Sequence, residues 1–115
     1  MRSYLLGCLM LASLSGCGEA SLAPLPLDVG IAASRLTAAP GDSINFLVTA
    51  AGGRLIGVEA SFGDGALAQY NTAGSRTARV TFRHAYVGAG IYIVEATVTD
   101  AAAGMKSATL EVRVN

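Results

Sequence analysis

Apolar and polar residues alternate with a period of two along most of the chain. In the segment SINFLVTA (43–50), the apolar residues Ile44, Phe46 and Val48 are each separated by one position. Because successive side chains of a strand point to opposite faces, this pattern predicts half-buried β-strands, and no comparable stretch has helical spacing. Two further segments show the same alternation, RTARVTFRH (76–84) and ATLEVRV (108–114).

Short segments rich in small turn-forming residues separate the alternating ones. They are PGDS (40–43), AGG (51–53), FGDG (62–65), AGS (73–75), VGAG (87–90) and AAAG (101–104). Short strands with turn signals every 8 to 12 residues or so are typical of an immunoglobulin-like β-sandwich, so the predicted fold class is all-β. We predict seven strands, at 29–38, 44–50, 55–62, 66–71, 77–84, 91–99 and 106–114.

The size and charge of the chain narrow the function classes. The sequence has 115 residues, with 8 Lys and Arg against 8 Asp and Glu. This length suits one small domain with its own core. The balanced charge gives no basic excess for nucleic acid and no polybasic segment for anionic lipid, so we expect no nucleic-acid partner.

The first residues have the layout of a secretory signal. Met1, Arg2 and Ser3 precede YLLGCLMLASL (4–14), an apolar run that ends in small residues. This run is shorter than the roughly 20 apolar residues that a transmembrane helix needs. We therefore predict that residues 1–16 are a signal peptide.

The sequence LSGC (14–17) resembles the lipobox of bacterial lipoproteins. The resemblance implies cleavage before Cys17, attachment of lipid to its sulfur and acylation of its new amino group, so that palmitate should label the protein. The alternative is an ordinary signal peptide with an incidental cysteine at its end. Cys8 would leave with the signal, so no disulfide is expected. Because Gly18 rather than aspartate follows the cysteine, the resemblance points to the outer membrane of a bacterial cell envelope.

Residues 17–27 are expected to connect the lipid to a folded domain at 28–115. The segment GEASLAPLPL (18–27) contains Pro24 and Pro26, which favour an extended tether. In polyproline geometry, at about 3.1 Å per residue, it would reach roughly 30 Å. Two or more acyl chains anchor a protein stably. We therefore expect the domain to stay close to a bilayer without a transmembrane helix.

Two blocks, SFGDG (61–65) and HAYVGAGIYIVEATVTD (84–100), resemble the hallmark motifs of the PKD (polycystic kidney disease) domain. That family has an immunoglobulin-like β-sandwich fold, and the resemblance covers most of residues 28–114. The matched positions are Phe62, Gly63, Asp64, Gly65, His84, Tyr86, Gly90, Tyr92 and Val94.

One position departs from the family pattern. Ala60 stands where the family usually has tryptophan, and the chain contains no tryptophan. Such a ring buries on the order of 200 Å². We expect either a thinner core or compensation from Phe46, Phe82 or Tyr70.

The motif residues also have roles that follow from their chemistry. Gly63 and Gly65 allow positive φ on either side of Asp64, whose carboxylate can accept backbone N–H groups and close the turn. Three aromatic residues flank the connection between the fifth and sixth strands, where we expect rings to pack inward and to bond the backbone through a hydroxyl or ring nitrogen. They are His84, Tyr86 and Tyr92.

Sandwich topology should bring Asp42, Asp64 and His84 to one end of the domain. A zinc site needs about four nitrogen or sulfur ligands, and the chain has one histidine and two cysteines. Calcium needs about six to eight oxygens, and no calcium-loop spacing occurs. No Gly-x-Ser-x-Gly elbow or phosphate-binding glycine loop occurs either. We therefore predict no enzyme activity, no metal site and no cofactor.

The two outer faces of the predicted sandwich differ in charge. Arg79 and Arg83 should face outward on one sheet, whereas acidic residues and two isoleucines should face outward on the other. The alternative is that both faces are simply solvated. The residues on the acidic face are Glu59, Glu95, Glu111, Ile91 and Ile93.

The PKD resemblance implies a module for adhesion, spacing or docking. We accordingly expect a non-enzymatic envelope lipoprotein that binds another protein through Arg79, Arg83, Glu95 or Glu111. One alternative is a module for polysaccharide or calcium, for which Tyr70 is the aromatic candidate. A second alternative is a structural lipoprotein without a dedicated ligand.

Overall fold

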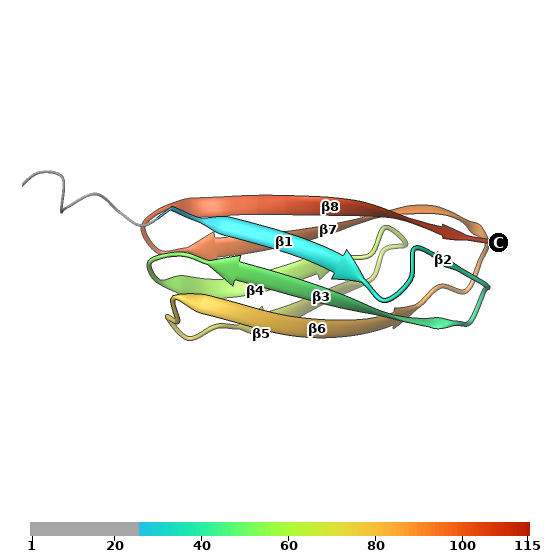
Figure 1. Ribbon diagram of the computed structural model, residues 1–115, viewed down its shortest axis with the longest axis horizontal. Helices are drawn as coiled ribbons and strands as arrows, with labels where there is room; N and C mark the ends of the chain where they lie inside the picture. Colours follow the sequence, from blue (N-terminus) through green and yellow to red (C-terminus); the bar gives the residue numbers. More distant parts are fainter. Residues whose placement is uncertain (1–25) are drawn as a thin grey trace, which may run out of the picture.

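The computed structural model describes residues 26–115, so the expected signal peptide, Cys17 and most of the tether lie outside the described residues. The described part is all-β and forms two packed sheets, as predicted (Figure 1). The strands are β1 (Asp28–Ala33), β2 (Thr37–Ala38), β3 (Ser43–Ala51), β4 (Leu55–Ser61), β5 (Leu67–Asn71), β6 (Thr77–Ala85), β7 (Gly90–Asp100) and β8 (Gly104–Val114).

The sheets contain three and five strands. The smaller sheet has the order β1-β3-β6 and is antiparallel throughout. The larger sheet has the order β2-β8-β7-β4-β5, in which only the short β2–β8 pair is parallel. Residues 26–115 contain no helix that could cross a bilayer.

The first expected strand, 29–38, is two strands that belong to different sheets. β1 pairs with β3, whereas β2 pairs with the end of β8. The chain crosses between the sheets at Ser34–Leu36, where the Ser34 N–H donates to Asn45 O at 2.8 Å and Leu36 O accepts from the Arg113 N–H at 2.8 Å. Residues 26–115 therefore form eight strands rather than seven, because this edge segment satisfies its backbone groups against both sheets in turn.

The core between the sheets consists of two neighbouring clusters. Ala60 is fully buried in the first cluster with Phe46 and Phe62, whose ring centroids are 5.5 Å apart. Phe82 packs against both clusters. Tyr70 is 53% exposed. Phe46 and Phe82 therefore fill the space beside Ala60, and Tyr70 does not.

Leu27, in the range expected for the tether, packs in the second cluster. Its side chain is 9% exposed and joins Val48, Leu55 and Val98 among others. An apolar residue directly before β1 gains more from covering this end of the core than from staying in water. The packed domain therefore begins at least one residue before β1.

The turns gather at two opposite ends of the sandwich. We call the end where β1 begins the proximal end; it carries the turns 52–54, 72–76 and 101–103 (Figure 1). We call the other end the distal end; it carries the turns 39–42 and 62–66 and the loop 86–89.

Asp100 organises the turns of the proximal end. Its residue is 3% exposed, Oδ1 accepts from the Arg54 N–H at 2.6 Å, and Oδ2 accepts from the N–H groups of Ala102 and Ala103, both at 2.9 Å. The hydrogen bonds from Ala103, Arg54 and Ala102 lower the pKa of Asp100, although burial opposes this effect. The ionised carboxylate thus joins the β3–β4 turn to the β7–β8 turn.

We expect Asp100→Asn to lower the melting temperature at pH 7, because an amide nitrogen would face N–H donors. Folding lowers the pKa of the Asp100 carboxyl, so the carboxylate stabilises the folded protein at pH values above the unfolded pKa of about 3.9. This stabilisation disappears as the pH falls through the folded pKa. The difference in melting temperature between parent and variant should therefore shrink on acidification below about pH 4. Thermal unfolding followed by circular dichroism measures it.

The matched control is Asp28→Asn, which removes an exposed carboxylate that lies 3.6 Å from Lys106 Nζ. This change should alter the melting temperature little. A difference for Asp100→Asn that stays constant down to pH 2 would contradict the role given to its charge.

Candidate functional site

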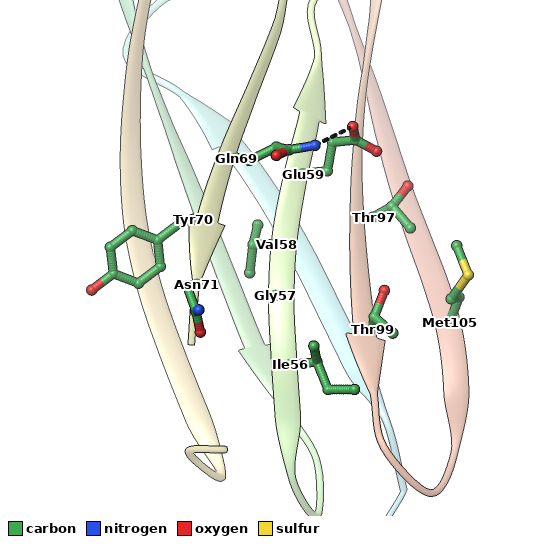
Figure 2. Close-up of a pocket in the computed structure, with 10 residues that line it drawn as sticks. All are labelled: Ile56, Gly57, Val58, Glu59, Gln69, Tyr70, Asn71, Thr97, Thr99 and Met105. Atoms are coloured by element: carbon green, nitrogen blue, oxygen red, sulfur yellow. Dashed lines mark hydrogen bonds between the residues drawn. The ribbon is translucent and has the colours of Figure 1, made fainter. Parts of the chain in front are cut away.

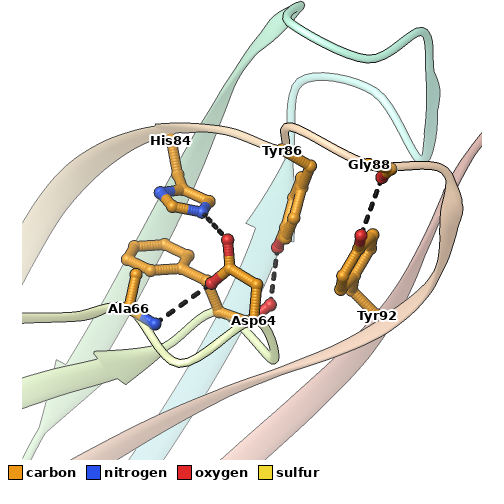
Figure 3. Close-up of polar contacts among 7 residues, drawn as sticks. Asp64, Ala66, His84, Tyr86, Gly88 and Tyr92 are labelled. Carbon is orange, nitrogen blue, oxygen red and sulfur yellow. Dashed lines mark hydrogen bonds and ion pairs between the residues drawn. The ribbon is translucent and has the colours of Figure 1, made fainter.

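The turn after β4 has the backbone that its two glycines predicted. Gly63 and Gly65 have φ values of 88° and 96°, and Asp64 lies between them. The Phe62 N–H donates to Ala66 O at 3.1 Å and closes the turn. The turn thus fixes the position from which the Asp64 side chain points toward β6 (Figure 3).

Gly63 meets a second constraint that Gly65 does not. A Cβ atom on Gly63 would lie 2.7 Å from Ile93 O and 3.1 Å from Ile93 N. No atom lies within 4 Å of the same position on Gly65. The turn therefore approaches the backbone of β7 so closely at Gly63 that a side chain has no room there.

Asp64 and His84 form a pair across the two sheets (Figure 3). His84 Nε2 lies 2.7 Å from Asp64 Oδ2, and Asp64 Oδ1 accepts from the Ala66 N–H at 3.1 Å. Burial raises the pKa of Asp64, but the hydrogen bonds from His84 and Ala66 outweigh it, so the net pKa is lowered. Because the ionised carboxylate only accepts, Nε2 carries the proton. We expected the His84 ring to bond to the backbone, but its Nε2 bonds to the carboxylate of Asp64 instead.

The two tyrosines bond to the backbone as the sequence predicted. Tyr86 OH donates to Phe62 O at 2.8 Å, and Tyr92 OH donates to Gly88 O at 2.7 Å. Burial, followed by the negative charge of Asp64 and by Tyr92, raises the pKa of Tyr86 to about 12. Tyr86 therefore remains a neutral donor that joins the end of β6 to the end of β4.

Five rings form a continuous row through the distal end. Phe62 stacks on His84 with ring centroids 4.2 Å apart. His84 and Tyr86 meet edge to face, with ring centroids 4.7 Å apart. Tyr86 stacks on Tyr92 at 4.2 Å, and Phe46 lies at the inner end of the row, beside Phe62. Offset and edge-to-face contacts of this kind add about 0.5–1.5 kcal/mol per pair beyond burial. The row therefore strengthens a region where Ala60 contributes little volume.

The Asp64–His84 pair has no partners for metal or nucleophilic chemistry among residues 26–115. Asp42 lies at the same end of the sandwich, as expected, but its carboxylate accepts from the Ala39 N–H at 3.1 Å and from Arg35 at 3.4 Å. No group of three or more His, Cys, Asp and Glu residues gathers within the described residues. The pair joins the turn 62–66 to β6, and its side chains are 17% (His84) and 25% (Asp64) exposed.

The outer face of the larger sheet carries the predicted acidic and apolar residues. Ile91 and Ile93 are 54% and 53% exposed. Ile93 is in register with Glu111, and Glu95 follows on the same face of β7. We call Ile91 and Ile93, with the flanking Glu95 and Glu111, the isoleucine patch. It lies toward the distal end, where the loop residue Val87 is 93% exposed.

The outer face of the smaller sheet carries Arg79 and Arg83, as expected. Both are exposed on β6, in register with Thr49 and Asn45 of β3. Within residues 26–115 neither guanidinium has an ion-pair partner. The outer face of the larger sheet is mixed in charge, because the exposed Arg113 of β8 is in register with Ile91, two positions from Glu111.

A shallow hollow of about 340 Å³ lies on the larger sheet at the proximal side of the isoleucine patch (Figure 2). It forms over Gly57, which has no side chain between its register neighbours Thr99 and Asn71. Gln69 donates to Glu59 at 3.1 Å at its edge, and the ring of Tyr70 points away from β4.

Sequence reasoning missed the Asp100 carboxylate that joins two turns of the proximal end. The sequence did contain a signal for the bonds to Ala102 and Ala103, namely an aspartate directly before AAAG (101–104). Aspartate side chains commonly accept N–H groups from residues two or three positions later. The bond to Arg54, 46 residues away, had no such signal.

No protein-family model matches this chain, and no curated protein matches it in sequence. Solved structures do match it in fold. The PKD domain of an M14-like peptidase from Thermoplasmatales archaeon SCGC AB-540-F20 has a TM-score of 0.59 at 23% identity, covering 79% of this chain and 94% of that one. The CARDB domain of the PF1109 protein from Pyrococcus furiosus, in complex with di-metal ions, has a TM-score of 0.60 at 18% identity, covering 79% and 93%.

A third similar structure is the PKD domain of the human VPS10 domain-containing receptor SorCS2. Its TM-score is 0.53 at 27% identity, covering 80% of this chain and 74% of that one. The shared property of these structures is the two-sheet sandwich. The described part of the chain therefore has a PKD-like immunoglobulin-like fold, with its motif residues in the turn and aromatic row of the distal end.

The two glycines of the turn give a matched pair of variants. Gly65→Ala should cost about 1–2 kcal/mol of unfolding free energy, because alanine is strained at φ near 96°. Gly63→Ala should cost roughly 3 kcal/mol or more, because the same strain is joined by the overlap with Ile93 O. Urea unfolding followed by circular dichroism measures both values. Equal losses would show that the close approach to β7 is unimportant.

Proposed function

We propose that the protein is a bacterial envelope lipoprotein whose sandwich binds another protein and carries out no catalysis. The lipobox-like LSGC (14–17), preceded by an apolar run, supports acylation of Cys17 and anchoring, with Gly18 favouring the outer membrane. The PKD-like fold supports a binding role, since such a domain presents two sheet faces and two sets of turns.

The isoleucine patch carries the docking part of this proposal. Two adjacent large side chains that stay half-exposed on a sheet face lose favourable burial unless a partner covers them. Glu95 and Glu111 border Ile93, and Arg113 borders Ile91, so the fitting partner has an apolar surface with basic side chains opposite the two carboxylates and an acidic one opposite Arg113. By contrast, the residues nearest the middle of the same sheet are small and polar, such as Thr97 and Ser107.

The patch is also placed where a partner can reach it. β1 begins at the proximal end, so a lipid on Cys17 would bring that end toward the bilayer. The isoleucine patch lies toward the distal end and would face away from the membrane. Anchoring and docking would thus use opposite ends of one rigid sandwich.

A polysaccharide ligand is the second candidate, and the hollow over Gly57 favours it. Its lining includes the hydrogen-bonding side chains of Asn71, Thr97 and Thr99. Sugar binding usually also uses an aromatic face, and Tyr70 points away from this hollow (Figure 2). The isoleucine patch therefore remains the better supported surface.

Substitution of Cys17 tests the anchor. Cys17→Ser should abolish palmitate labelling and move the protein from the membrane fraction to the soluble fraction, because serine offers no thiol for lipid attachment. Cys8→Ser is the matched control and should leave both properties unchanged. A Cys17→Ser protein that stays in the membrane fraction would disprove the lipid anchor.

Photo-crosslinking in the native envelope tests the docking face. Probes in place of Glu95 and Glu111 should capture one identifiable protein, whereas probes in place of Arg79 and Arg83 should not. In the Glu95 probe background, Ile93→Ser should lower that capture at least several-fold, and Arg83→Ser should leave it unchanged. The same products at all four probe positions would exclude a dedicated face and favour a structural lipoprotein.

A further inference from the structure

The fold gathers basic residues at the proximal end that lie far apart in the sequence. Of the 8 Lys and Arg residues one is Arg2, and three of the other seven lie at this end: Arg54, Arg76 and Lys106. All three are exposed. No polybasic segment was visible in the sequence because these residues are separated by 22 and 30 positions.

Hydrogen bonds between the turns make this end one continuous surface. The Gly52 N–H donates to Arg76 O and the Leu55 N–H donates to Ser75 O, both at 2.8 Å. The Ala101 N–H donates to Arg54 O at 2.9 Å. The Arg54 side chain lies over Gly74, where an added Cβ would be 3.6 Å from its Nε. Arg54 and Arg76 therefore project from turns that are fixed to each other.

Among the described residues, the two carboxylates at this end reduce the formal charge of its three cations from +3 to +1, but neither pairs with an arginine side chain. Asp100 is 3% exposed, and its oxygens accept backbone N–H groups. Asp28 is exposed and pairs with Lys106 at 3.6 Å, a distance and exposure at which such pairs contribute little. Within residues 26–115, neither Arg54 nor Arg76 forms an ion pair.

Apolar side chains complete the surface. Ala101, Ala102 and Ala103 form an exposed turn, and Met105 beside it is 69% exposed. Small and flexible apolar groups among arginines suit the boundary between phosphate headgroups and acyl chains. The distal turns 39–42, 62–66 and 86–89 carry no lysine or arginine. Near that end Arg35 is paired with Asp42, and Arg83 and Arg113 lie on the outer faces of the sheets.

We propose that the proximal end lies on an anionic phospholipid surface, with Arg54 and Arg76 on headgroup phosphates and the turn 101–103 among the headgroups. This inference rests on the proposed anchor at Cys17, which would hold the domain within roughly 30 Å of the lipid if residues 18–27 adopt polyproline geometry. Each cation near an anionic membrane strengthens binding roughly fivefold. The lipid supplies the anchor, and the proximal end then sets the orientation of the sandwich, with the isoleucine patch away from the bilayer.

The test uses a chain that begins at residue 17 and carries Cys17→Ser, so that only the sandwich surface can bind. The described members of both core clusters lie at or after Leu27, so this chain keeps them. Lipid nanodiscs that contain a gadolinium-chelating lipid are added, with or without phosphatidylglycerol. Amide relaxation is then measured by NMR, because it reports which end of the protein approaches the bilayer.

With phosphatidylglycerol present, relaxation enhancement should be at least severalfold larger at residues 101–103 than in the loop 86–89. The double variant Arg54→Gln and Arg76→Gln should weaken binding roughly 25-fold. The matched double variant Arg79→Gln and Arg83→Gln removes the same charge from a sheet face and should leave the pattern at 101–103 intact.

Three results would overturn the inference: equal enhancement at both ends, the same enhancement without phosphatidylglycerol, or the same loss in both double variants. Since this chain has no thiol at residue 17, the result does not depend on acylation. A failed palmitate label would disprove the proposed anchor, and a failed relaxation pattern would disprove the membrane contact.

Discussion

The hydrogen bond between Asp64 and His84 is the constraint on which the distal end depends. It joins the turn after β4, in the larger sheet, to β6, in the smaller sheet, at 2.7 Å. The Tyr86 hydroxyl makes a second link between the same two regions through Phe62 O. Without these links, the stacked rings would have to position the turn through nondirectional contacts alone. Asp100 acts in a comparable way at the opposite end, so a carboxylate that accepts N–H groups organises the turns at each end.

The alternating pattern predicted the fold well because a two-faced strand leaves a local signal. Ile44, Phe46 and Val48 are all fully buried, and Arg79 and Arg83 are exposed, as the alternation of side chains along each strand predicts. The glycine positions predicted the turn at Asp64 for the same reason, since positive φ is a property of single residues. What could be predicted is therefore what each short segment determines by itself.

The features that the sequence did not predict are those set by distant segments. The division of the first strand depends on backbone partners in β3 and β8 that no local pattern specifies. His84 carries a ring that can bond either to a backbone carbonyl or to a carboxylate, and only the folded turn brings Asp64 into reach. The core shows the same limit. The small side chain of Ala60 is visible in the sequence, but the packing of Phe46 and Phe82 in its cluster becomes visible only in the structure.

The pairing of β1 with β3 determines how the domain would respond to mechanical load. β1 runs from the proximal end toward the distal end and pairs with β3 at six registered positions, Asp28 to Ala33. A pull between an anchor before Asp28 and a partner at the distal end would act along this strand. Rupture would then require all the β1–β3 hydrogen bonds to slide at once, whereas a pull across the strand would open them one by one. Attachment at this end therefore loads the sandwich in shear, the direction in which a pair of strands resists force most strongly.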